Sequence, residues 1–384
     1  MEVKQIYDIM NTVTDEVLGT ENLVKEDLSN IVDIGTEIFN ASAVDNYVKS
    51  LVNHIGKVVF VNRPYAGSAP SVLMDGWEFG SVLQKINAEL PEAQENESWD
   101  LVDNASYDPN VFKKPQVSTK FFNKKVTFEI QMSFTEMQVK ESFSSVEQLN
   151  GFMSMLYTAI DKSMTVKLDS LIMRTINNMI GETVYAEYGA ANINSKSTTK
   201  AVNLLYLYNQ QYSKSLTAAA ALTDPDFIRY AAYVIGMTAN RMSKISKIFN
   251  VGGKDRFTPA DYLHVVMLTD FKKAADVFLQ SGTFNDEFTR LPKAEEVPYW
   301  QGSGTGYAFA DTSKVYIKTA SGHDETITGV LGVMFDRDAV GVTNMNRRVT
   351  ANYNPKAEFF NNWFKYDAGY FNDLNENFVV FFVA

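Results

Sequence analysis

Apolar residues recur every three or four positions through residues 1–56, which is the spacing of one face of a helix. They are Val3, Ile6, Tyr7, Met10, Val13 and Val17, and then Val44, Tyr47, Val48, Leu51 and Ile55. The pattern predicts amphipathic helices, and Gly56 is a candidate C-terminal cap. The run from Val58 to Val61 then predicts a short strand.

The period changes to two between residues 77 and 134. Trp77, Phe79 and Val82 begin a strand-like stretch, and residues 126–134 alternate strictly between apolar and polar. The apolar members of the alternation are Val126, Phe128, Ile130, Met132 and Phe134. Such alternation predicts a strand with one buried face. We expect these strands to form a two-stranded ribbon, which is marginal alone in water and needs cover from its own long helix or from a neighbouring molecule.

Two segments of opposite charge lie between these strands. The acidic residues are Glu89, Glu92, Glu95, Glu97, Asp100 and Asp103, with no Lys or Arg among them. The basic residues are Lys113, Lys114, Lys120, Lys124 and Lys125, with no acid among them. The two segments either fix the register between neighbouring molecules or are solvated faces of one loop.

Residues 145–181 predict one long helix. Ser145 is a candidate N-cap with Gln148 three residues later, as in a capping box, and Gly181 is the predicted end. The apolar positions begin with Leu149, Phe152, Met153, Leu156 and Ile160 and continue to Ile180. At about 1.5 Å per residue the helix would be roughly 55 Å long.

Residues 200–345 predict a separate α/β unit. Asp224-Pro225 would cap a helix, Leu263 to Leu268 would form a buried strand, and Asp270 would cap the following helix. Strands are also expected at Val315–Ile317 and Val330–Phe335. The aromatic segment 346–384 predicts further strands that close the structure.

Composition excludes several classes of function. The chain has 384 residues, no cysteine and a net charge of −11. The absence of cysteine excludes disulfides, thiolate zinc sites and cysteine nucleophiles. The acidic balance argues against a free-standing nucleic-acid binder. The start lacks a signal peptide, and the most apolar stretch, 378–384, is too short to span a bilayer.

Candidate catalytic motifs are weak. Gly302-Ser303-Gly304-Thr305-Gly306 lacks the Gly-Lys-Ser/Thr of a phosphate loop, so a flexible loop is the better interpretation. Asp336 and Asp338 could bind Mg²⁺ or act in acid–base catalysis. A position at the N-terminus of a helix, where acidic side chains are favoured, is the better explanation of the pair. The three histidines do not share a metal-binding spacing, and His264 fits a core position. We therefore predict no catalytic, cofactor or metal site.

The order of these parts resembles the Hong Kong 97-type fold of tailed-phage major capsid proteins. The most specific stretch, GVMFDRDAVGVTNMNRRVTANYNPKAEFFNNWFKYDAGYFNDLNENFVVFF from Gly332 to Phe382, looks like the C-terminal end of many such proteins from phages of Gram-positive hosts. A second similar stretch is VFVNRPYAGSAPSVLMDGWEFGSVLQKI, from Val59 to Ile86. The resemblance covers essentially the whole chain.

The resemblance implies an α+β fold and a division into domains. It implies an N-terminal arm (1–56), a P-domain strand and loop (57–76), a long hairpin called the E-loop (77–140), a P-domain with the spine helix 145–181 (141–199), an α/β A-domain (200–345) and P-domain C-terminal strands (346–384). The E-loop would lie over the spine helix of the neighbouring subunit. The expected inter-subunit residues are Lys113, Lys114, Lys120, Lys124, Lys125, Val126, Phe128, Ile130 and Met132, and on the spine helix Leu149, Phe152, Met153, Leu156 and Ile160.

The resemblance also implies binding partners and a location in the virion. Copies would form hexamers and pentamers of an icosahedral head in the virion, assembled in the host cytoplasm without a membrane. The head would enclose double-stranded DNA without sequence-specific contact. A portal, a separate scaffolding protein and a decoration protein are the other partners considered. We expect a chain that keeps Met1 and forms no Lys–Asn crosslinks.

Two other classes of function compete with this interpretation. One is an encapsulin-like compartment shell of the same fold, which encloses cargo proteins and no genome. The other is a carboxylate-based hydrolase with Asp336 and Asp338 as its acid–base pair. Nucleic acid inside purified particles would separate the two kinds of shell, and loss of a reaction without loss of assembly would reveal the hydrolase.

Overall fold

The computed structural model describes residues 3–19, 24–25, 28–40, 46–47, 50–51, 69–74, 83–88, 103–104, 110, 112, 114, 117–189, 193–280, 291–301 and 308–384. The chain forms two compact units, which are considered separately. Unit 1 comprises Met1–Phe79, Lys125–Ile172 and Val342–Gly369. Unit 2 comprises Gly80–Lys124, Met173–Gly341 and Tyr370–Ala384.

Most of the described part of the N-terminal segment of unit 1 is helical, as predicted. Helix α1 covers Val3–Leu18 and α2 covers Ile31–Asn40. Ile9, Met10 and Val13 of α1 and Ile31, Ile34 and Ile38 of α2 are buried. The hydroxyl of the buried Tyr47 contacts the sulfur of Met10. Gly56 and the predicted strand 58–61 lie outside the described residues.

The long helix begins where the sequence indicates and ends later. Helix α5 covers Val146–Tyr188, and the amide of Gln148 donates to Ser145 Oγ at 3.2 Å. Gly181 lies within the helix and does not end it. A Cβ at this position would overlap the buried side chain of Ile317, so the glycine permits close packing within unit 2. The chain leaves the helix at Gly189, which has a φ of 57°. A short helix α4, Glu136–Ser142, precedes α5.

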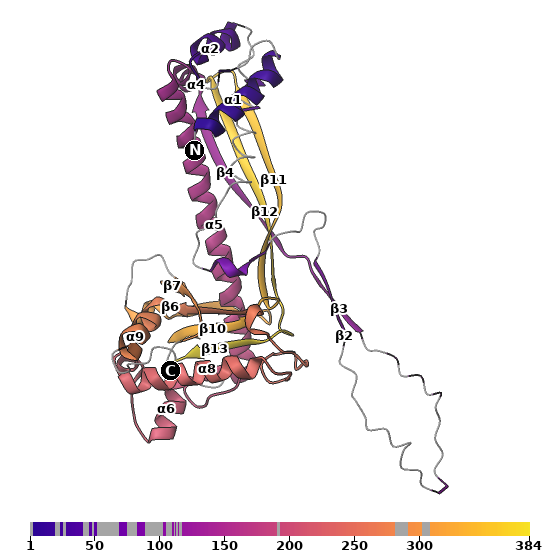
Figure 1. Ribbon diagram of the computed structural model, residues 1–384, viewed down its shortest axis with the longest axis vertical. Helices are drawn as coiled ribbons and strands as arrows, with labels where there is room; N and C mark the ends of the chain where they lie inside the picture. Colours follow the sequence, from indigo (N-terminus) through magenta and orange to yellow (C-terminus); the bar gives the residue numbers. More distant parts are fainter. Residues whose placement is uncertain are drawn as a thin grey trace. The chain divides into compact units, whose positions relative to one another are not determined.

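Unit 1 contains a four-stranded sheet in the order β1-β11-β12-β4. The strands are β1 Leu73–Met74, β11 Val340–Asn354, β12 Phe359–Asn372 and β4 Lys125–Thr135, and the 3₁₀ turn Pro70–Val72 precedes β1. Strand β4 pairs antiparallel with β12 from Phe359↔Thr135 to Gly369↔Lys125. The strands lie beside the first part of α5 (Figure 1), where Phe134 meets Phe152 edge-on at 5.6 Å.

This pairing corrects the two-stranded ribbon expected for residues 77–134. The alternation at 126–134 does form a strand, but its partner is β12, more than 220 positions later in the sequence. The hairpin is formed instead by β2 Leu83–Ala88 and β3 Val117–Phe122. A periodic pattern shows that a face is buried, but it does not identify the strand that pairs beside it.

Unit 2 is built on a five-stranded sheet in the order β5-β13-β10-β6-β7. The strands are β5 Ala201–Asn203, β13 Phe378–Phe382, β10 Val330–Asp336, β6 Leu263–Leu268 and β7 Glu295–Val297. Strand β10 pairs antiparallel with both β13 and β6, whereas β5 and β7 are parallel to their neighbours. The three central strands are largely apolar and buried, as strands covered on both faces are.

Helices cover this sheet and complete the core of unit 2 (Figure 1). They are α6 Leu204–Tyr212, α7 Ala218–Ala221, α8 Pro225–Met242, α9 Thr269–Gln280 and α10 Phe309–Thr312, with a 3₁₀ turn at Ala260–Tyr262. The predicted cap of α8 is confirmed, because Asp224 accepts from the amides of Asp226 and Phe227 at 2.9 and 3.0 Å. A small hairpin, β8 Val315–Lys318 and β9 Asp324–Ile327, completes the unit.

The C-terminal segment contributes to both units, as helix α5 does. Residues 342–369 belong to unit 1 with the part of α5 up to Ile172, and residues 370–384 belong to unit 2 with the rest of α5. Strand β13, an apolar run that is entirely buried, lies between β5 and β10 in the sheet of unit 2. The expectation that residues 346–384 share one domain with the spine helix stays a prediction.

Gly329 provides a test of the close packing around β13. It has a φ of 75°, and a Cβ there would overlap the carbonyl oxygen of Val383. Gly322, with a φ of 88° and open space around it, is the matched control. We expect Gly322→Ala to cost about 1 kcal/mol for the left-handed backbone alone. Gly329→Ala should cost about 1–3 kcal/mol more, because β13 must shift.

Thermal unfolding of both variants measures this difference. Equal destabilisation of the two would show that β13 is not packed against residue 329 as described.

Candidate inter-subunit site

The hairpin β2–β3 has two chemically different faces. Its strands pair in register from Leu83↔Phe122 to Ala88↔Val117. Directly paired residues point to the same face, and successive residues point to opposite faces. One face, here the inner face, carries Leu83, Lys85, Ser118, Lys120 and Phe122. The other, the outer face, carries Gln84, Ile86, Val117, Thr119 and Phe121.

The inner face is attached to unit 2 by charge. Lys120 Nζ lies 2.8 Å from Asp373 Oδ1, and Lys85 Nζ lies 3.1 Å from Asp373 Oδ2. Lys85 also pairs with Glu376 at 2.7 Å. We call these four residues, Lys85, Lys120, Asp373 and Glu376, the hairpin anchor. Beside it, the rings of Phe122 and Phe371 lie 5.2 Å apart, so an apolar contact adds to the ion pairs.

The anchor resolves a conflict within the hairpin. Lys85 and Lys120 are directly opposite each other in the register, and like charges in that position destabilise a strand pair. Asp373 has no exposed surface and places one carboxylate oxygen on each lysine. Glu376 is in turn paired with Arg256 at 3.1 Å. The hairpin therefore depends on the segment after β12 for its electrostatic balance.

The protonation of Asp373 follows from these contacts. Burial by itself raises the pKa of this carboxyl. The hydrogen bond from Lys120 and the charge of Lys85 outweigh burial and hold the pKa of Asp373 below its ordinary value. Asp373 is thus ionised at neutral pH and in mild acid.

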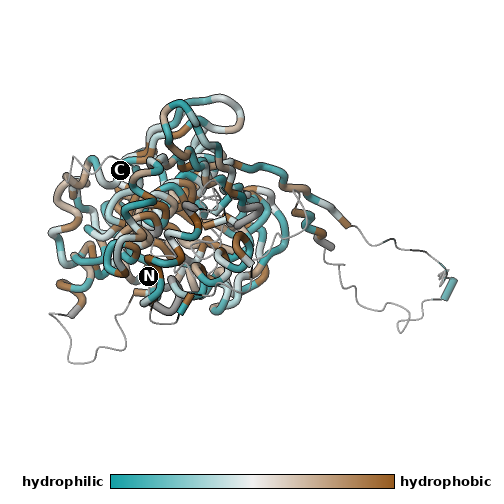
Figure 2. Tube along the Cα trace, turned by 90° about the horizontal axis from the view of Figure 1, so that it is seen from above, coloured by the Kyte–Doolittle hydropathy of each residue, from teal (hydrophilic) through white to brown (hydrophobic). Residues whose placement is uncertain are grey.

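The outer face exposes apolar side chains. Ile86 is 62% exposed, Val117 58% and Phe121 62%. We call these three residues the outer stripe. Figure 2 shows the hairpin strands with apolar positions among polar ones. Because the inner face is fixed to unit 2, the outer stripe is the side of the hairpin that is directed to solvent in a single copy.

The lysines predicted to contact a neighbour differ in their surroundings. Lys114, Lys124 and Lys125 are exposed, and Lys113 lies outside the described residues. Lys120 is engaged with Asp373 of its own chain in the hairpin anchor, and the inter-subunit role of these lysines stays a prediction. Of the acidic segment only Asp103 is described, and it is exposed.

The apolar residues predicted for the interface belong to the body of unit 1. Val126, Phe128, Ile130 and Met132 are half-buried on one face of β4, and Phe128 stacks on Tyr366 at 6.3 Å. The spine positions Leu149, Phe152, Met153, Leu156 and Ile160 are all buried within the subunit. They form its core and offer no surface to another copy. Met155 and Val166 are the exposed apolar residues of that helix segment, at 54% and 66%.

Sequence reasoning missed the outer stripe for an identifiable reason. The apolar residues of VSTKFF alternate only partly, and Ile86 stands alone among polar neighbours. Only the register of β2 against β3 brings Ile86, Val117 and Phe121 to one face.

The residues considered for catalysis have structural partners. Asp336 ends β10 in a turn, not at a helix N-terminus, and accepts from Thr258 Oγ1 at 2.8 Å and from the amide of Asp338 at 2.9 Å. His264 is half-buried and stacks on Phe335 at 5.8 Å, and burial lowers its pKa. The segment 302–306 lies outside the described residues. Within the described ranges no three His, Asp or Glu side chains gather as metal ligands, and no helix is long and apolar enough to cross a bilayer.

The chain is similar to chains in several solved phage structures. A chain in "Structure of head fiber and inner core protein gp22 of native bacteriophage P68" is 11% identical, with a TM-score of 0.53 over 84% of this chain and 86% of that chain. A chain in "Capsid structure of Staphylococcus phage Andhra" is 11% identical, with a TM-score of 0.48 over 82% and 83%. One in "Capsid structure of the Cyanophage P-SCSP1u" is 10% identical, with a TM-score of 0.42 over 82% and 86%. No curated protein matches the sequence.

A family model identifies the class as a structural protein of the phage head. The model of the Phi29-like phage major capsid protein matches residues 10–382. The chain belongs to the Phi29-like phage major capsid protein family. The predicted class of phage major capsid protein, its mixed α and β structure and its place in the virion are thereby confirmed. Membership implies a structural, non-enzymatic protein that assembles with itself.

The hairpin anchor predicts a pH-dependent loss of stability on Asp373→Asn. The substitution keeps the size of the side chain and leaves the two lysines facing each other. Breaking a buried ion pair lowers the free energy of unfolding, and because Lys120 is 37% exposed we expect the low end of the usual cost, about 3 kcal/mol at neutral pH. A carboxyl whose pKa is lower in the folded than in the unfolded state stabilises the folded state at pH values above its unfolded pKa, which is about 3.9. This contribution to the free energy of unfolding is lost as the pH falls through the pKa of the folded state.

Denaturant unfolding of parent and variant from neutral pH to pH ~2 should therefore show curves that differ at neutral pH and converge in acid. The matched background carries Lys85→Met and Lys120→Met, in which Asp373→Asn should cost much less. An equal cost in both backgrounds would contradict the anchor.

Proposed function

We propose that copies of this chain form hexamers and pentamers of an icosahedral phage head that encloses double-stranded DNA. In this proposal the hairpin β2–β3 extends over a neighbouring subunit and buries the outer stripe there. The portal, a separate scaffolding protein and a decoration protein remain the further partners that we propose for the assembled head.

One observation carries the proposal: the outer stripe is exposed on a hairpin whose inner face is already engaged. A two-stranded hairpin has little core of its own. Burying an Ile or Phe side chain contributes about 1.5–3 kcal/mol, so covering Ile86 and Phe121 on a neighbour would supply several kcal/mol per subunit. Repeated around a closed shell, this contribution is large enough to favour assembly.

The charge of the chain is consistent with a wall around DNA. At −11 the subunit carries no overall attraction for phosphate. Such a shell would contain a packaged genome without binding it tightly. This supports a container and argues against a protein that organises DNA through sequence-specific contacts.

An encapsulin-like shell is the second candidate, because it would use the same fold and the same hairpin. Membership of a phage major capsid family favours the phage head. The hydrolase alternative is not favoured, because the family is structural and Asp336 is engaged with Thr258.

The contents of the particle distinguish the two shells. Heads purified from cells that produce the phage should hold nuclease-protected double-stranded DNA, measured by absorbance and by gel after nuclease treatment. Particles filled with host protein and without DNA would favour the compartment shell.

The outer stripe is tested by the double substitution Ile86→Asp and Phe121→Asp. Both side chains are exposed in the single copy, so we expect a normally folded subunit. Assembly should require more than about tenfold higher subunit concentration, because at least 1.4 kcal/mol of burial is lost per contact. Light scattering and electron microscopy measure assembly, and thermal unfolding measures the fold.

Two controls separate the hairpin from the sheet. Thr119→Asp introduces a charge on the same face at an exposed polar position and should have a much smaller effect. Phe128→Asp should instead destabilise the isolated subunit, because Phe128 stacks on Tyr366 inside unit 1. Normal shell formation by the double variant would refute a role for the outer stripe.

A further inference from the structure

Unit 2 contains a pocket that is lined mainly by tyrosine. Its lining residues come from α6, from the loop after it and from α8, and the cavity measures about 370 Å³. They are Tyr208, Tyr212, Lys214, Asp226, Arg229, Tyr230 and Tyr233, which we call the tyrosine pocket. The hairpin anchor and the outer stripe share no residue with it.

The tyrosine rings hold one another in place. Tyr208 is buried and contacts Tyr212 at 5.1 Å, Tyr230 at 5.6 Å and Phe227 edge-on at 5.6 Å. Tyr212 and Tyr230 meet edge-on at 5.8 Å. Aromatic pairs of this geometry are favourable beyond the area that they bury. The wall of the pocket is therefore formed before anything binds.

Part of this wall remains accessible. Tyr212 is 51% exposed and Tyr233 is 63% exposed. Tyrosine gives a large contact area at a small cost in side-chain entropy, and Tyr and Arg are enriched where protein interfaces contribute most of their binding energy. A pocket lining that combines exposed tyrosines with an arginine is thus typical of a protein-binding surface.

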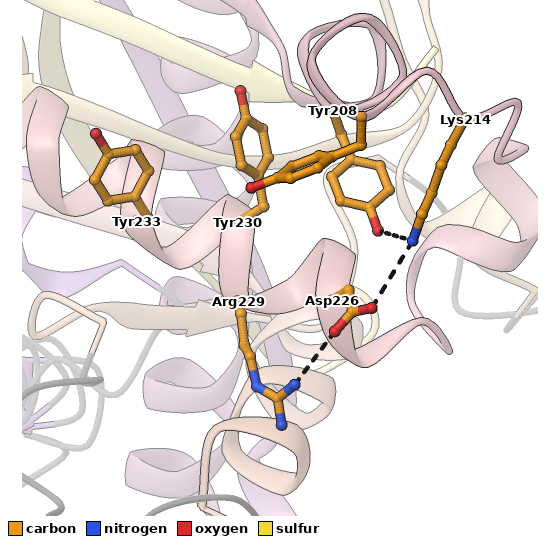
Figure 3. Close-up of a pocket in the computed structure, with 7 residues that line it drawn as sticks. Tyr208, Lys214, Asp226, Arg229, Tyr230 and Tyr233 are labelled. Atoms are coloured by element: carbon orange, nitrogen blue, oxygen red, sulfur yellow. Dashed lines mark hydrogen bonds and ion pairs between the residues drawn. The ribbon is translucent and has the colours of Figure 1, made fainter.

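The charges of the pocket favour an acidic occupant. Lys214 Nζ donates to the Tyr208 hydroxyl at 2.8 Å and lies 3.8 Å from Asp226 (Figure 3). Arg229 lies 3.3 Å from the other oxygen of Asp226. Two cations share one carboxylate, so the lining carries one net positive charge on a chain whose net charge is −11. The surface of another copy, being acidic overall, is electrostatically complementary to it.

We propose that the tyrosine pocket is a contact between copies of this chain, in which an acidic side chain and an adjoining apolar group of the next subunit enter the pocket. The proposal rests on the proposed function, because a ring of subunits joins one patch of each copy to a different patch of the next. A cavity of this size accommodates a few side chains. DNA fits less well, because duplex binding uses several Lys and Arg contacts to phosphate, and the lining of the pocket supplies only Lys214 and Arg229.

A single introduced thiol tests the contact directly. The chain has no cysteine, so Tyr233→Cys places a unique reactive group at the rim of the pocket. Maleimide labelling would be followed in free subunits, in empty shells and in DNA-filled heads. We expect labelling at least about tenfold slower in both kinds of particle than in free subunits, because a buried core position of an interface excludes reagent and water.

Each outcome has a distinct meaning. Equal labelling in particles and free subunits would overturn the pocket as a contact and leave shell assembly intact. Protection in DNA-filled heads but not in empty shells would identify DNA as the occupant and also overturn it. If the parent chain forms no particles, the proposed function fails and this inference fails with it.

A charge variant provides an independent measurement. Arg229→Glu should raise the subunit concentration needed for assembly by about tenfold, while Arg229→Lys should keep most of the parent behaviour. Arg241→Glu makes the same change of charge on the same helix outside the pocket and is the matched control. Equal effects of Arg229→Glu and Arg241→Glu would show that only net charge matters and would contradict the proposal.

Discussion

Two lysines that face each other across a strand pair set the central constraint of this subunit. A hairpin of two short strands has little apolar contact of its own, and Lys85 opposite Lys120 would separate the strands. Asp373 offsets that repulsion from a fully buried position, and Glu376 adds a second carboxylate that is itself held by Arg256. The same interaction decides which face of the hairpin is engaged and which face, the outer stripe, is exposed.

The residues of the anchor are far apart in the sequence, and this links several parts of the chain. Lys85 precedes the acidic segment and Lys120 lies within the basic segment, whereas Asp373 and Glu376 lie between β12 and β13. Strand β13, all of whose residues are buried, is an inner strand of the five-stranded sheet, between β5 and β10. The core of unit 2 therefore positions the carboxylates that position the hairpin. A change in the packing of β13 would therefore shift the hairpin and its exposed outer stripe, which come from another part of the sequence.

The surfaces left exposed differ in chemistry, and this bears on assembly. The outer stripe is apolar and would gain from burial alone. The tyrosine pocket is preformed, carries a net positive charge on an acidic chain, and would contribute specificity through charge complementarity. A shell protein needs both kinds of contact, because apolar burial supplies affinity while charge and shape determine which surfaces meet. Each contact can be weak by itself, since closure of a shell multiplies it over many copies.

The sequence by itself determined the elements that depend on local periodicity and capping. The strand at 126–134, the cap of α5 at Ser145, the cap of α8 at Asp224 and the strand at 263–268 all follow from neighbouring residues. The resemblance of the stretch Gly332 to Phe382 indicated the family. Tertiary structure alone decided that β4 pairs with β12, that the helix continues past Gly181 and that Lys120 faces Asp373. Local pattern reports whether a face is buried, but pairing depends on residues more than two hundred positions away, and no local pattern encodes that choice.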